Sequence, residues 1–499
     1  MKKLYFLLLF MTISANAQQI DLTWAEKIKT KGQVMVLGGQ KGTYFTGHLD
    51  KDDHLVCRKY NDKMQMMQEE IVPFELDQKR FTYYNSIFIK NKITHVISER
   101  IRKEDKDILF ASFTDLNLKN NDKTIVLDET LEDEKTVGFG KTYVSPDSTK
   151  VLIYRERKGR KKEPSTLVFK VFAGDFTKVL LDKVVEIPIK NRNFSTESIS
   201  VDNLGNVYVL AKIIRENKER QKGQSSFYFK LVVFDKINAT PKEFDFDFEN
   251  QEVGSIDIIP SKNNTLICTG FLRGIEEGFF SKKVSAVSDE MFSAILNCST
   301  LDLSSTFKLK VEGLYPEKIR KSEDFVPYLV RNIFPKPDGG YVVVAEQYKL
   351  VIYTTYSQQG GTRTSYNYYY CDIACLHIDK SGKLESITKI PKYQLNASNP
   401  SIISTYVNGN TYIVYEDLAK NLTAENDKET KKSSKGFFTS DSRNALFVLT
   451  IAPNGAPTKE IIYDYKESKL RPRIFSSRLI NPSTIILNAD DQIGKLQFN

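Results

Sequence analysis

Histidine is scarce in this sequence, and its pattern gives little support to a metal site. The four histidines are His48, His54, His95 and His377, which are too scattered for a ligand set of regular spacing. His48 and His54 flank the acidic segment 50–53, but that segment stands where a hairpin turn is expected, and we interpret it as a solvated turn. No complete calcium-loop pattern occurs. The sequence therefore predicts no metal site.

Cysteine is also rare, and the five residues exclude a disulfide-rich framework. Cys268 and Cys298 are placed so that they could face each other on neighbouring strands of one sheet. Cys371 and Cys375 lie four apart on one expected strand, which is too far for a bond between them. For all five, including Cys57, burial as a small apolar side chain is favoured over a redox role.

The motifs of several enzyme classes are absent. The sequence contains no Gly-x-Ser-x-Gly elbow, no phosphate-binding loop and no dinucleotide fingerprint. These absences remove support for a hydrolase of that class, for a nucleotide-binding enzyme and for a bound cofactor. No catalytic residue is assigned from the sequence.

Long apolar runs are missing except at the N-terminus. Lys2 and Lys3 precede the apolar run 4–13, and Ala15-Asn16-Ala17 follows as a small-residue cleavage site. This order predicts a secretory signal peptide over 1–17, followed by a single domain over 18–499. The predicted location is outside the cytoplasm, in the periplasm by default, with the cell surface or the medium as alternatives. No later run reaches the roughly 18 apolar residues that a spanning helix needs.

What the sequence does have is a regular succession of short strands. Tyr and Phe number 25 and 31, and from about residue 33 apolar and aromatic residues alternate between turns rich in Gly, Asn, Asp and Pro. The tight turns recur in pairs of hairpins, which gives a four-stranded unit of roughly 50 to 65 residues. The units are expected at 33–76, 81–131, 137–188, 194–249, 253–314, 326–393 and 399–465.

A single four-stranded unit cannot bury both faces of its sheet, whereas units stacked in a closed ring bury both faces and protect the edges. The fold class predicted is therefore all-β, a β-propeller of four-stranded blades. Residues 470–499 add further short strands, which we expect to pair with an N-terminal strand such as 20–24. This favours eight blades, with seven as the alternative; an open stack or two β domains would be a different architecture.

Two turn segments carry a family resemblance. Ser145-Pro146-Asp147 before a strand, and Lys336-Pro337-Asp338-Gly339-Gly340, resemble the turns of TolB-like and related exported bacterial β-propellers. The resemblance spans most of the chain in rhythm but few residues in each repeat. The Gly-His and Trp-Asp pairs of WD repeats are absent. An amino-terminal α/β domain of the TolB type is also absent, so a TolB-type role is not implied.

Several connections are longer than a propeller needs, and the topology places them on one face. The connections between the second and third strands of the blades all leave the same side of the ring, and excess length in loops is often functional. One such loop is basic and another is rich in tyrosine, and each has a simpler interpretation, as a solvated loop or as strands that extend beyond the blade. The candidate partner-binding residues are Arg157, Lys158, Arg160, Lys161, Lys162, Tyr356, Tyr366, Tyr368 and Tyr369.

The predicted function is a non-enzymatic one, in which these loops bind a protein or glycan partner in the cell envelope. The alternative is a carbohydrate-active enzyme, with acidic residues from several blades around the central channel. The net charge of +9 permits an anionic partner without requiring one. Nucleic acid is not expected, because the chain is predicted to be exported and the basic loops lack interleaved aromatic residues.

Overall fold

A computed structural model describes most of the chain. The described residues are 20–30, 33–74, 81–120, 124–131, 136–216, 218–221, 224–235, 240–277, 282–286, 288–315, 326–356, 361–395, 401–426, 428–432, 443–467, 470–489 and 491–499. The expected signal peptide, 1–17, lies outside these residues.

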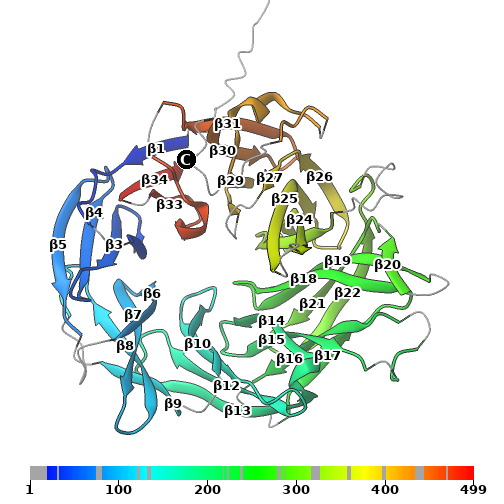
Figure 1. The fold of residues 1–499 in the computed structure, drawn as a ribbon, viewed down its shortest axis with the longest axis horizontal. Coiled ribbons are helices and arrows are strands. Elements are labelled where there is room, and N and C mark those ends of the chain that lie inside the picture. Colours follow the sequence, from blue (N-terminus) through cyan, green and yellow to red (C-terminus); the bar gives the residue numbers. More distant parts are fainter. Residues whose placement is uncertain are drawn as a thin grey trace, which may run out of the picture.

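Eight antiparallel sheets stand in a ring (Figure 1). The first strand of each blade is at the centre, where most of the first strands contact those of both neighbouring blades. The last strand is at the rim. This arrangement confirms a β-propeller of four-stranded blades, and the number is eight, not seven.

The first four blades follow the chain in order. Blade 1 contains β2 (Met35–Gln40), β3 (Thr43–Leu49), β4 (Leu55–Asn61) and β5 (Met66–Val72). Blade 2 contains β6 (Thr82–Ile89), β7 (Lys92–Ile101), β8 (Lys106–Thr114) and β9 (Ile125–Leu131). Blade 3 contains β10 (Thr136–Val144), β11 (Lys150–Arg157), β12 (Pro164–Ala173) and β13 (Val179–Lys190). Blade 4 contains β14 (Phe194–Val201), β15 (Val207–Ile214), β16 (Phe227–Phe234) and β17 (Lys242–Phe246).

Two of the remaining blades carry an extra short strand. Blade 5 contains β18 (Gln251–Pro260), β19 (Thr265–Glu277), β21 (Glu290–Asn297) and β22 (Asp302–Lys310), with β20 (Lys282–Ala286) beside β19. Blade 6 contains β23 (Tyr328–Pro335), β24 (Tyr341–Tyr356), β25 (Thr362–Ile378) and β26 (Leu384–Ile390), with β27 (Gln394–Leu395) beside β25. Blade 7 contains β28 (Ile402–Val407), β29 (Asn410–Leu418), β30 (Asn444–Ile451) and β31 (Pro457–Asp464). The described 3₁₀ helices are η1 (Asn191–Asn193), η3 (Ala419–Thr423) and η4 (Ile474–Ser476).

Blade 8 joins the two ends of the chain. It contains β32 (Arg478–Asn481), β33 (Thr484–Ala489), β34 (Gln492–Phe498) and, at the rim, β1 (Ile20–Trp24). β1 runs antiparallel to β34, from the pair Ile20 and Phe498 to the pair Trp24 and Gly494. The predicted ring-closing strand is thus confirmed, and it supplies the fourth strand of the last blade.

The blades hold together because both faces of each sheet are apolar. On β12, Leu167 and Phe169 point to blade 4, where Phe169 meets the ring of Phe234 at a centroid distance of 4.8 Å. Phe172 points to blade 2 and packs in a second cluster. Alternate residues of one strand therefore belong to different interblade cores, which is why the central strands are apolar on both sides.

At the centre of the ring, polar side chains connect neighbouring blades. Asn85 donates to Thr142 across blades 2 and 3, at 3.0 Å, and Asn332 donates to Ser404 across blades 6 and 7, at 2.7 Å. Arg478 of blade 8 donates to the carbonyl oxygen of Leu37 in blade 1, at 3.1 Å. The first strands of all blades except blade 7 also shift register against their second strands. Such bulges bend the inner strands and re-aim their side chains.

The turns form because Asp and Asn side chains bind the backbone of the turn. Asp202 accepts hydrogen bonds from the N–H groups of Leu204 and Asn206, each at 2.9 Å. The first turn of blade 7 depends on its backbone conformation. Asn408 and Gly409 both have positive φ, at 53° and 85°, between the paired residues 407 and 410 of a two-residue hairpin.

All five cysteines are free, and four of them are buried. Cys268 lies opposite Ala294 in the ladder of β19 and β21. The expectation that Cys268 and Cys298 face each other on neighbouring strands is therefore wrong. Cys298 follows β21 and is buried in the same core between blades 4 and 5. Burial as small apolar side chains is thus confirmed for these two thiols.

Candidate functional site

The connections between second and third strands leave one side of the ring, and its most prominent feature is the hairpin of blade 6. β24 and β25 are 16 and 17 residues long, and they pair with each other from Tyr341 and Ile378 to Tyr356 and Thr362. The flanking strands are shorter. β23 reaches only Gln347 of β24, and β26 reaches only Ile373 of β25. The hairpin therefore extends beyond its blade, as one of the two interpretations of the tyrosine loop predicts.

The register divides this extension into two different faces. Cross-strand partners share a face, and one face carries in succession the pairs Leu350 with Tyr368, Ile352 with Tyr366, Thr354 with Thr364 and Tyr356 with Thr362. We call the side chains of Leu350, Ile352, Tyr356, Tyr366 and Tyr368 the apolar hairpin face. Tyr356 is 81% exposed, Ile352 54% and Tyr366 53%. Aromatic and aliphatic side chains thus lie in solvent on this face, with the threonine pair 354 and 364 between Ile352 and Tyr356.

The opposite face of the hairpin is more polar. It carries Lys349, Tyr353, Ser365 and Tyr369, among others. The ring of Tyr369 lies 6.3 Å from that of Tyr393, and burial, followed by the neighbouring Tyr353, raises its pKa. The four predicted tyrosines are therefore split: three lie on the apolar hairpin face, and Tyr369 lies behind it.

At its base, the apolar hairpin face joins a buried ionic cluster. Tyr348 and Tyr370 are the next pair on the same face, and the Arg331 guanidinium lies over both rings, 5.7 and 5.8 Å from their centroids. Arg331 is 2.8 Å from the Glu346 carboxylate, which also binds Lys392. Because the Glu346 and Lys392 side chains are fully buried, the root of the hairpin is fixed in one arrangement.

The basic loop of blade 3 is a short, well-anchored turn. Lys158, Arg160, Lys161 and Lys162 are exposed, and the N–H of Glu163 closes the turn on the carbonyl oxygen of Arg160, at 2.9 Å. η1, in the connection to blade 4, forms hydrogen bonds with this loop. Its Asn191 donates through the side chain to Gly159 and through the backbone to Glu163.

Arg157 lies outside the loop that carries the other four predicted basic residues. It is the last residue of β11, it pairs with Thr136 on one side and Thr166 on the other, and it is half-buried. The first predicted residue of the basic set therefore lies in the sheet, while the other four lie in the loop.

Two further connections bring more positive charge to this loop. Lys190 and Arg192, around η1, both bind Glu216 of the blade 4 loop, at 2.6 and 3.1 Å. Lys218 lies 3.8 Å from the same carboxylate. The hydrogen bond from Lys190, then that from Arg192, lowers the pKa of Glu216 to about 2. The Glu216 carboxylate thus lies near three cations from two segments, and the sequence alone did not predict that these segments are in contact.

The acidic turn near the two N-terminal histidines has a structural explanation. Asp50, Asp52 and His54 lie close enough to share an ion, with ligand atoms within 4.8 Å of one another. The Asp50 carboxylate accepts the N–H groups of His54 and Asp52, and the bond from His54 is the main cause of its lowered pKa. The group is an exposed turn between β3 and β4, as the sequence predicts, and we assign it no metal.

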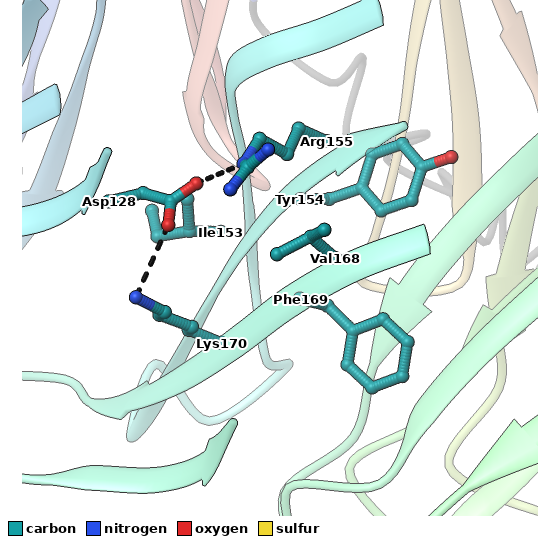
Figure 2. A pocket seen from close by; sticks show the side chains of 7 residues that line it. All are labelled: Asp128, Ile153, Tyr154, Arg155, Val168, Phe169 and Lys170. Atoms are coloured by element: carbon teal, nitrogen blue, oxygen red, sulfur yellow. Dashed lines mark hydrogen bonds and ion pairs between the residues drawn. The ribbon is translucent and has the colours of Figure 1, made fainter. Parts of the chain in front are cut away.

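A narrow pocket lies at the seam of blades 2 and 3. Figure 2 shows Asp128 between Arg155 and Lys170, with Ile153 and Val168 nearby. Asp128 of β9 binds Arg155, and it lies 3.2 Å from Lys170. The walls leave no room for a water molecule, so this pocket is a packed ionic contact between blades and offers no space for a ligand.

No protein-family model and no curated protein matches the chain. Solved structures that resemble it include the WD40 domain of SCAP from fission yeast, with 9% identity, a TM-score of 0.41 and coverage of 96% of this chain and 98% of that one. The β-propeller domain of the Trilobed protease from Pyrococcus furiosus has 12% identity, a TM-score of 0.36 and coverage of 88% and 98%.

A carbohydrate-active enzyme is also among these structures. Polysaccharide lyase Uly1 has 10% identity, a TM-score of 0.37 and coverage of 79% of this chain and 96% of that one. The comparisons therefore favour neither a binding function nor an enzymatic one. Within the described residues, no helix has the length and apolar character needed to cross a membrane.

Proposed function

We propose that this protein is a non-enzymatic binding protein that captures a protein partner through the apolar hairpin face. The observation that carries the proposal is the projection of β24 and β25 beyond their blade, with Ile352, Tyr356 and Tyr366 more than half exposed on one side. A two-stranded hairpin gains little stability by itself, so an exposed apolar face on it is costly unless a partner covers it.

The chemistry of this face favours a protein over a glycan. Leu350 and Ile352 stand between the tyrosines, and aliphatic side chains offer neither a flat ring nor a polar group to a sugar. The exposed parts of the face amount to roughly 400 Å², taking about 200 Å² for a whole aromatic side chain. This is about half of the ~800 Å² that each partner buries in a standard interface. The partner is therefore expected to contact neighbouring loops as well.

Export is part of the same proposal. We propose that residues 1–17 are removed as a signal peptide and that 18–499 form one domain outside the cytoplasm, in the periplasm or at the cell surface. The resemblance to exported bacterial TolB-like propellers supports this location. Its two turn segments are tight turns closed by Asp147 and Asp338, whose carboxylates accept the N–H groups of Thr149 and Gly340.

Affinity capture from an envelope extract tests the proposal with two matched variants. Tyr366→Ser removes a tyrosine of the apolar hairpin face, and Tyr353→Ser removes one from the opposite face at nearly equal exposure, 53% and 50%. A protein recovered by the wild type and by Tyr353→Ser, but lost with Tyr366→Ser, supports the proposal. Equal recovery by both variants contradicts it.

The enzymatic alternative predicts a different outcome. On the eight channel-lining strands the carboxylates are Glu197, Glu252 and Asp257, which lie on blades 4 and 5 alone. Cleavage of any envelope glycan by the purified protein, abolished by Glu197→Gln or Asp257→Asn, would replace a binding function with that of a carbohydrate-active enzyme.

A further inference from the structure

The side of the ring that carries the blade 6 hairpin has a second candidate surface, on blades 3 and 4. We define the basic sector by the exposed and half-buried cations of three connections, the loop 158–163, the connection 190–193 and the loop 216–221 without residue 217. Its members are Lys158, Arg160, Lys161, Lys162, Lys190, Arg192, Lys218 and Arg220. We propose that the basic sector binds an anionic polysaccharide, which goes beyond the protein-binding function of the hairpin.

The three connections form one continuous surface. The carbonyl oxygens of Lys161 and Glu163 accept the N–H groups of Arg192 and Asn191, and Glu216 binds Lys190 and Arg192. Cations from blade 3, from the junction and from blade 4 are therefore held side by side by contacts between their own backbones and side chains. A solvated charge run in a single loop would not require these contacts.

The charge of the sector is not internally balanced. Its eight cations face three carboxylates in the same segments, Glu163, Glu216 and Glu219. The Glu163 carboxylate accepts the N–H of Arg160, and Glu219 accepts from the backbone of Glu216. In the part of the chain described, no carboxylate pairs with the ammonium groups of Lys158, Lys161 or Lys162.

These features match a polyanion with spaced charges. Lysine ammonium groups on a fixed surface attract carboxylate, sulfate and phosphate groups without needing one ligand geometry. Nucleic acid is less well matched, because the three connections contain no aromatic residue on which a base could stack. A polysaccharide that carries carboxylate or sulfate groups along its length can contact several of the cations at once.

Binding to immobilised heparin, which carries both sulfate and carboxylate, tests the proposal, with polygalacturonate as a carboxylate-only probe and dextran as a neutral one. The loop variant is Lys158→Ser/Lys161→Ser/Lys162→Ser in the mature chain. The control variant is Lys178→Ser/Lys262→Ser/Lys380→Ser. It removes three exposed lysines from turns on the other face of the propeller, where first and third strands connect to the strands that follow them. Both variants have the same net charge.

We expect the loop variant to bind heparin roughly 10-fold more weakly, because three exposed charge contacts of modest strength are lost. The control variant and Tyr366→Ser should bind like the wild type, which separates this site from the hairpin. Equal weakening of the two triple variants would show attraction by net charge alone and overturn the proposal. Equal binding to dextran, or tighter binding to duplex DNA than to heparin, would also overturn it. Polygalacturonate binding as tight as heparin binding would assign the recognition to carboxylates, and its absence to sulfates.

Discussion

Asp417 is a buried carboxyl in β29 whose ionisation should make the stability of the fold depend on pH. Its side chain is 1% exposed, and its Oδ1 accepts hydrogen bonds from the N–H of Leu418 and from the Asn421 amide, at 2.7 and 2.9 Å. Burial raises the pKa of Asp417 to about 7, although both hydrogen bonds, Lys392 and Lys459 act in the other direction. Desolvation is therefore the stronger effect at this site.

The sign of the effect follows from this raised pKa. Below the pKa of the unfolded chain, near 4, the carboxyl is protonated in both states and stability is unaffected. As the pH rises, the unfolded state releases its proton first, so the folded state loses stability until the pH passes about 7. At up to about 1.4 kcal/mol for each pH unit, the loss between pH 5 and pH 8 is about 3 kcal/mol.

Urea unfolding of the wild type and of Asp417→Asn at pH 5 and pH 8 measures this loss. The neutral amide should be more stable relative to the wild type at pH 8 than at pH 5, by about 3 kcal/mol in the free energy of unfolding. Asp379→Asn is the control, because turn hydrogen bonds lower the pKa of this exposed carboxyl and it stays ionised across the interval. If Asp417→Asn and the wild type change in parallel, the reasoning is wrong.

Three further predictions concern ring closure, the blade seams and the thiols. A Cβ at Gly494 would lie 2.7 Å from the ring of Trp24, so Gly494→Val should displace β1, cost about 1–3 kcal/mol and expose the N-terminal strand to limited proteolysis. Asp128→Ala removes the carboxylate that binds the buried Arg155 and Lys170 and should cost about 3–5 kcal/mol in urea unfolding, whereas a cost below 1 kcal/mol would contradict the seam contact. Cys371 has its pKa raised to about 12 by burial, so a thiol reagent at pH 8 should label the native protein slowly and all five cysteines after unfolding; rapid native labelling would refute this.

The fold was predictable because its determinants are local and repeated. Strand alternation and turn residues mark each blade, and the short apolar segments at both ends indicate a blade shared between them. The pair of Trp24 and Gly494 confirms that inference. The register shifts of the inner strands were not predictable, since an extra residue in one strand leaves no clear mark in the alternation.

The candidate site was predictable only in part. The spacing of Tyr366 and Tyr368 places them on one face of any strand, but the position of Tyr356 depends on the register across the hairpin tip. Leu350 and Ile352 belong to that face and were missed, although their spacing of two is a usable signal. The approach of Lys190 and Arg192 to the basic loop depends on how blades 3 and 4 pack, which a single sequence does not show.

Site-specific photo-crosslinking in intact cells tests the binding function most directly. A photoreactive residue is placed at 366, on the apolar hairpin face, and in a second protein at 353, on the opposite face of the same hairpin. The account predicts a discrete protein adduct from position 366 and none, or far less, from position 353. An absence of protein adducts at 366, or the same adduct at both positions, would contradict the claim that this face binds a partner.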